Sequence, residues 1–243
     1  MTRRYTMTTQ NHTLLRKLIL GGTPLLTGLL LLFHPLPEQA GMQHLDLPQG
    51  LALYELMAPI AASFLAVHAI LPLALALLGL SVILLLQGVG GIAANISRVG
   101  AFVFSVTYIL YETIIGTVTA LLVRGAADLS LAEQAVIGDA VYRNFTDPIF
   151  GDLPSVVSVT AWLSWMAAVI LAAVALRRSG KPLGACILLG LSCIFVSHAS
   201  LLGPLGMLLF FCAVLGLERS RLREADGREL EAKAIVSSRR VQE

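Results

Sequence analysis

Apolar runs long enough to cross a lipid bilayer fill most of this 243-residue chain and alternate with short polar gaps. A bilayer core of about 30 Å requires about 20 apolar residues in a helix that rises about 1.5 Å per residue. Charged residues make up only 13% of the sequence, whereas a soluble domain carries about a quarter. The sequence therefore predicts an all-α, polytopic integral membrane bundle whose partner is the lipid bilayer.

The lengths of the apolar runs and the residues that interrupt them predict about six transmembrane helices. The run from 51 to 86 is too long for one span and contains Pro59 and Pro72, so we expect part of it to lie outside the membrane or to kink. The run from 182 to 217 is divided into two spans, with one bent helix as the alternative. The predicted spans are about 18–34, 61–86, 99–123, 155–176, 182–199 and 204–217.

The basic residues are distributed very unequally among the gaps. Four of the 17 Lys and Arg residues lie in an N-terminal tail (1–17), seven in a C-terminal tail (218–243), three between the fourth and fifth spans, and Arg98 follows the second span. Only Arg124 and Arg143 lie in the remaining gaps. Because basic loops stay in the cytoplasm, we expect a multi-pass protein of the cell membrane with both tails cytoplasmic.

The longest outer gap is predicted to contain an amphipathic helix at about 130–145. Ser130 and Glu133 match a capping box, and apolar residues then recur at helical spacing. We expect this helix to lie on the outer membrane face or to cover the bundle. The net charge of +2 arises from basic ends and acidic outer loops, so no nucleic-acid partner is expected.

Four ionisable side chains in different predicted spans lie at a similar predicted depth. His34, His68, Glu112 and His198 lie roughly 21–28 Å above the cytoplasmic ends of their helices, at about 1.5 Å per residue. Ionisable residues in membrane helices usually face the bundle interior. We therefore predict that they converge in an outer-leaflet polar pocket for a small ligand, with Tyr108, on the Glu112 face, as a further member.

Three imidazoles and one carboxylate are suitable ligands for Zn²⁺ or another divalent metal. A metal held by His34, His68, His198 and Glu112 would activate a water for hydrolysis of a lipid-like substrate. The structural alternatives are that His34 is an interfacial residue at a helix end, that His198 satisfies loose backbone carbonyls, and that His68 bonds across helices. Both interpretations follow from the same residues.

The sequence carries no motif of a known family, and whether the protein is an enzyme stays open at this stage. One further hypothesis is haem held by His34 or His68 together with His198. Another is a small transporter or channel subunit, which the few spans and the lack of an internal repeat disfavour. Association into a homo-oligomer would supply additional helices for such a role.

Overall fold

The structure is a computed structural model, and it describes residues 14–34, 47–152, 154–196 and 200–241. All regular elements in these residues are helical. In chain order they are η1 (Leu18–Gly22), α2 (Thr23–Leu32), α3 (Gly50–Met57), η2 (Ala58–Ile60), α4 (Ala61–Leu85), α5 (Ile92–Tyr111), η3 (Glu112–Val118), α6 (Thr119–Gly125), α7 (Leu131–Thr146), α8 (Val156–Arg178), α9 (Leu183–Leu191), η4 (Ser192–Val196) and α10 (Leu202–Val241). The all-α membrane-bundle class that the sequence predicts is therefore confirmed.

Within the described residues, five helical stretches are long and apolar enough to cross a membrane. They are Leu14–Leu32, Gly50–Leu85, Ile92–Gly125, Val156–Arg178 and Leu202–Glu224. The predicted span at 182–199 coincides instead with a shorter apolar helix, Leu183–Phe195. At about 1.5 Å per residue this helix is shorter than the bilayer core of about 30 Å. Six spans and the orientation of the termini therefore stay predictions.

Close helix packing in the bundle depends on small residues, most clearly between α5 and α8. A Cβ atom at Gly100 would lie 2.9 Å from the backbone oxygen of Ser164, so only glycine permits this approach. Beside it, the Ser97 hydroxyl donates a hydrogen bond of 2.6 Å to the Ala168 carbonyl. Small residues and interhelical hydrogen bonds are the usual means of joining helices where lipid removes the hydrophobic driving force.

An aromatic cluster fills the core where the short α9–η4 segment returns against α10. Trp165 and Phe104 lie with ring centroids 4.7 Å apart, and Phe195 of η4 packs edge-on against Trp165 at 5.5 Å. A Cβ atom at Gly206 of α10 would lie 2.5 Å from the Phe195 backbone nitrogen. The segment is therefore held by packing in the bundle.

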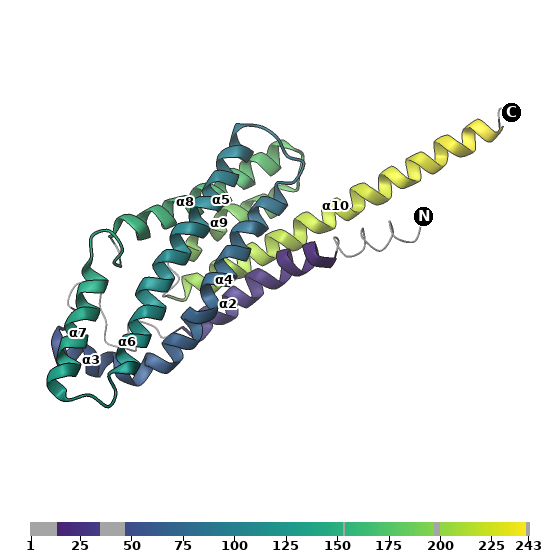
Figure 1. Cartoon of the computed structure of the whole chain (residues 1–243). Helices are drawn as coiled ribbons and strands as arrows, with labels where there is room; N and C mark the ends of the chain where they lie inside the picture. The colour runs from purple at the N-terminus through teal and green to yellow at the C-terminus, as the bar shows by residue number, and fades with distance from the viewer. Residues whose placement is uncertain (1–13, 35–46, 153, 197–199, 242–243) are drawn as a thin grey trace, which may run out of the picture.

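The two ends of the bundle differ in composition. Figure 1 shows the start of the first helix, the α4–α5 loop and the α8–α9 turn at one end, and α3, α6 and α7 at the other. We call the first the basic end, because Arg16, Arg98 and Lys181 lie there. We call the second the cap, formed by α3, α6 and α7 around a separate apolar cluster that includes Leu53 and Met57.

The cap begins where the long apolar run after Gly50 is interrupted. A 3-10 turn at Ala58–Ile60, which contains Pro59, separates α3 from α4, while Pro72 remains inside α4. α3 then packs on α7, and a Cβ atom at Gly138 would overlap the Gly50 carbonyl. Part of the run is thus used to build the cap.

α7 occupies the segment in which the sequence predicts an outer helix. Its capping box is complete, because the Ser130 hydroxyl accepts from the Glu133 backbone N–H and the Glu133 carboxylate accepts from the Ser130 N–H. The Ser130 hydroxyl also donates to the Glu133 carboxylate at 2.6 Å, and this bond, followed by the bond from the Ser130 N–H, lowers the pKa of the Glu133 carboxyl. Two backbone N–H groups, those of Phe150 and Ile149, lower the pKa of Asp147 in the same way after the helix ends.

Candidate functional site

His34, His68 and Glu112 meet inside the bundle from three different parts of the chain. His34 follows the end of α2, His68 lies in α4, and Glu112 is the first residue of η3. Their relative exposures are 7%, 2% and 1%. His68 Nε2 lies 3.2 Å from His34 Nε2 and also 3.2 Å from Glu112 Oε2. We call these three residues the triad.

The ring of His68 is fixed by its other nitrogen. Nδ1 lies 2.8 Å from the carbonyl oxygen of Phe64, one turn earlier in α4. A carbonyl oxygen can only accept a hydrogen bond, so Nδ1 carries a proton. The Phe64 ring also packs on both imidazoles, with centroids 4.0 Å from His68 and 5.7 Å from His34. Nε2 of His68 is therefore directed at His34 and Glu112, beside an apolar wall.

The two contacts of His68 Nε2 restrict where protons can reside. A protonated Nε2 donates to the Glu112 carboxylate, which makes His68 an imidazolium because Nδ1 is also protonated. An unprotonated Nε2 accepts from a neutral Glu112 carboxylic acid or from His34 Nε2–H. The His68–Glu112 pair has no net charge as imidazolium with carboxylate or as neutral imidazole with carboxylic acid. One proton can thus be shared without leaving a net charge in the membrane.

Glu112 begins a π-helical segment, η3, that is shaped around His68. A Cβ atom at Gly116 would overlap the imidazole ring of His68, so the ring lies directly against the helix backbone. The Thr117 hydroxyl donates a 2.9 Å hydrogen bond to the His68 carbonyl. π-Helical turns are rare and occur frequently at functional sites. The wide turn therefore contacts both the side chain and the backbone of His68.

The cap is bonded to the same π-helix. The Asn144 side-chain amide of α7 donates hydrogen bonds of 3.0 Å to the Ile114 carbonyl and to the Thr119 hydroxyl. Neither Asn144 nor Gly116 was predicted from the sequence to be a member of the site. For Gly116 the available signal was its position four residues after Glu112, on the same helix face. For Asn144 no local pattern indicated this contact.

Tyr108 and His198, the other two predicted pocket residues, are not part of the triad as described. The Tyr108 ring contacts the aromatic core, with centroids 5.1 Å from Phe104 and 5.9 Å from Phe195. His198 lies outside the described residues. The neighbouring Tyr111, which was not predicted, donates a 2.6 Å hydrogen bond from its hydroxyl to Asp152.

The metal-site hypothesis requires at least three ligands around one point. Within the described part of the chain, no three His, Cys, Asp or Glu side chains are placed to hold a metal ion. The described triad has the geometry of a hydrogen-bonded chain, with His68 in the middle. The predicted ligand set that includes His198 extends beyond the described residues and stays a prediction.

Comparisons with known proteins identified no relative of this chain. No protein-family model matches the chain, and no curated protein or solved structure matches it either. The class of the protein therefore follows from its own helices. Five of the described helical stretches are long and apolar enough to span a membrane, and the chain is a multi-pass integral membrane protein.

Proposed function

We propose that the triad is a proton-binding centre and that the protein acts as a proton-dependent membrane protein. The observation that carries this proposal is the position of His68 Nε2, 3.2 Å from both His34 Nε2 and Glu112 Oε2. Ionisable groups buried in membrane helices are costly and commonly mark proton relays or ligand sites. A purely structural contact would be made at lower cost by apolar side chains.

Protonation of the triad would alter contacts between helices. An additional proton that makes both histidines cationic places like charges 3.2 Å apart, one just after α2 and the other in α4. Loss of the shared proton leaves the Glu112 carboxylate facing the lone pair of His68 Nε2, so that two hydrogen-bond acceptors meet. Each change makes one interhelical contact repulsive. Uptake or release of a proton would therefore shift the packing of η3 against α4, as in other protonation switches.

The position of the triad favours exchange with the side opposite the basic end. Basic loops stay in the cytoplasm, so the basic end and both chain termini would lie on the cytoplasmic side of the cell membrane. The triad would then lie in the outer half of the bilayer, near the cap. A small polar ligand that enters from outside would bind there in a proton-dependent way.

Nitrogen NMR of the protein labelled with ¹⁵N-histidine tests the proton-binding centre directly. In lipid nanodiscs, Glu112→Gln should change the ¹⁵N shifts and pH titration of His68 and His34, because the amide cannot take up or release the shared proton. Glu55→Gln makes the same change at an exposed position of α3 and should leave these signals unaltered. Identical histidine titrations in the parent and Glu112→Gln would refute the proposal.

Metal analysis separates this proposal from the metal-dependent hydrolase. Purified protein is analysed for zinc and other metals, and its absorption spectrum is recorded for haem. The proton-binding centre predicts that His68→Gln and Glu112→Gln leave the metal content unchanged. Stoichiometric zinc that both variants lose would assign the triad to a metal site instead.

A further inference from the structure

A cavity of about 420 Å³ lies at the basic end, far along the chain from the triad. One lining residue, Pro182, precedes α9. The others belong to α10 and are Gly216, Arg219, Ser220, Arg223 and Glu224. The five α10 residues include spacings of three, four and seven, which place them along one helix face. This face of α10 therefore presents two arginines to a cavity.

Close contact between α10 and α9 forms one wall of the cavity. A Cβ atom at Gly216 would lie 3.0 Å from the Ala185 Cβ, so the two helices approach tightly there. One turn further along α10, at Arg219 and Arg223, the side chains are exposed. The cavity thus begins beside this close helix contact and is bordered farther along α10 by exposed arginine side chains.

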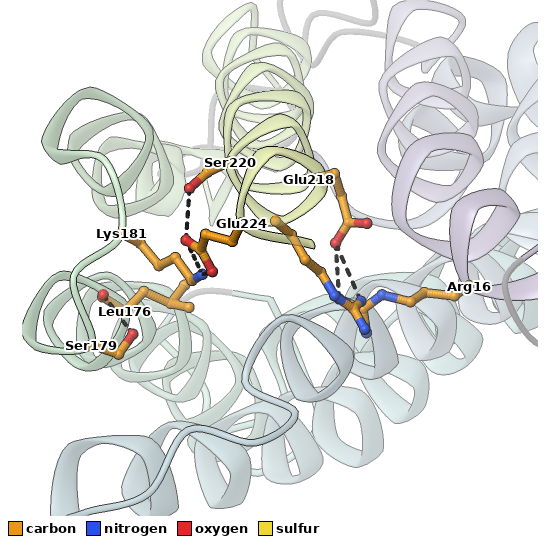
Figure 2. A network of polar contacts seen from close by, with 8 residues as sticks. Arg16, Leu176, Ser179, Lys181, Glu218, Ser220 and Glu224 are labelled. Carbon is orange, nitrogen blue, oxygen red and sulfur yellow. Dashed lines mark hydrogen bonds and ion pairs between the residues drawn. The ribbon is translucent and has the colours of Figure 1, made fainter. Parts of the chain in front are cut away.

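The single carboxylate in the cavity wall is already neutralised. Glu224 accepts hydrogen bonds of 2.7 and 2.6 Å from the Lys181 ammonium and one of 3.1 Å from the Ser220 hydroxyl (Figure 2). The ion pairs among the described residues do not engage Arg219 or Arg223. The cavity therefore has a net positive charge and is suited to an anion.

The cavity lies where α10 leaves the apolar part of its span. The last strongly apolar stretch of this helix ends at Leu217, and the candidate membrane span ends at Glu224. Toward the membrane centre, the exposed residues Leu208 and Leu215 continue the helix face that bears Arg219. An anion bound by the arginines would thus lie at headgroup depth, with apolar surface directly below it.

We infer that this cavity binds the phosphate of an anionic phospholipid from the surrounding leaflet. Arg219 and Arg223 pair with the phosphate oxygens, since guanidinium groups match phosphate geometry with two parallel hydrogen bonds. An acyl chain lies along Leu208 and Leu215. Basic pockets between membrane helices on the cytoplasmic side recognise anionic headgroups in this way. The site is separate from the triad and does not depend on the proposed proton chemistry.

Native mass spectrometry of the full chain in detergent tests the inference. Phosphatidylglycerol and phosphatidylcholine with the same acyl chains are titrated against the parent, against Arg219→Gln/Arg223→Gln, and against Arg221→Gln. We expect phosphatidylglycerol to bind the double variant at least about tenfold more weakly than the parent, because each basic residue near a headgroup contributes about a fivefold change. Arg221→Gln removes a charge on the same helix outside the cavity and should bind as the parent does.

Three results would overturn the inference. The first is equal binding of the two lipids, and the second is an equal loss in Arg221→Gln and in the double variant. The third is binding of inorganic phosphate with the affinity of the lipid, which would indicate a site for free anions. The charge-conserving variant Arg219→Lys/Arg223→Lys should bind more tightly than the glutamine double variant but more weakly than the parent, because it keeps the charge and loses the paired hydrogen bonds. Equal melting temperatures of all variants show that loss of binding is not loss of fold.

Discussion

The triad and the basic end contain the same kind of interaction in opposite surroundings. The Lys181–Glu224 pair at the basic end is short, at 2.6 Å, but its side chains are 20% and 44% exposed. The His68–Glu112 pair is longer, at 3.2 Å, and its side chains are 3% and 1% exposed. Exposed ion pairs contribute little because water screens them, whereas a buried charge without its partner is costly. The contribution of each pair to stability therefore depends on its burial more than on its distance.

The largest effect should follow from removing one partner of the buried pair. Glu112→Ala leaves His68 facing an apolar gap, and a broken buried ion pair typically costs about 3–5 kcal/mol. We expect a clearly lower melting temperature in detergent. Glu133→Ala, in the exposed capping box of α7, should cost much less. Comparable melting temperatures for the two variants would mean that Glu112 is not part of a buried network.

The next effect concerns the contact between the π-helix and His68. Gly116→Ala places a methyl group where the imidazole lies, so the ring or the helix must shift. Overpacking of this kind costs about 1–3 kcal/mol. Gly125→Ala adds the same methyl group at a position with no atom within 4 Å and should leave thermal stability nearly unchanged. If both variants melt like the parent, the packing of His68 on η3 is looser than described.

A smaller effect is expected where the cap is bonded to the bundle. Asn144→Ala removes the hydrogen bonds to the Ile114 carbonyl and the Thr119 hydroxyl, which should cost about 1–3 kcal/mol. Hydrogen exchange followed by mass spectrometry should show faster exchange in residues 112–119. Asn95→Ala, at an exposed position near the basic end, serves as the control and should leave exchange in that segment unaltered.

At the basic end the effect of a charge deletion should be small and dependent on salt. Lys181→Gln removes the ion pair with Glu224, which is worth about 0–1 kcal/mol because it is partly exposed. The difference in melting temperature between variant and parent should shrink as salt rises from low to high ionic strength. A large loss of stability that salt does not alter would show that this end resembles the triad.

The smallest effect should come from the exposed carboxylates of the cap. Hydrogen bonds in the folded protein lower the pKa of Glu133 and of Asp147. A group with a lowered pKa stabilises the folded state above its unfolded pKa, and this contribution is lost as the pH falls through the folded pKa. Below about pH 4 the cap should therefore lose protection against hydrogen exchange, measured relative to the intrinsic rate of an unfolded chain at the same pH, and Asp147→Asn should weaken that response.

The membrane class and the depth of the candidate residues follow from local properties of the chain. Apolar length and charge are sums over neighbouring residues, so the apolar runs identify a helical membrane protein without knowledge of any contact. Depth follows from the rise per residue, which is why His34, His68 and Glu112 could be placed in one layer. The capping box of α7 is equally local, because its two residues are three positions apart.

The rotation of each helix and the identity of the neighbours were decided only by the tertiary structure. Whether His68 faces Glu112 depends on how α4 packs on η3, and the contact of Gly116 with the imidazole is part of that packing. The bond from Asn144 joins residues 30 positions apart, Asn144 and Ile114. Among the described residues, the apolar helix Leu183–Phe195 is shorter than a span, and its last residue, Phe195, packs closely against Gly206 of α10. Such contacts depend on the shapes of distant surfaces, and no local pattern of residues encodes them.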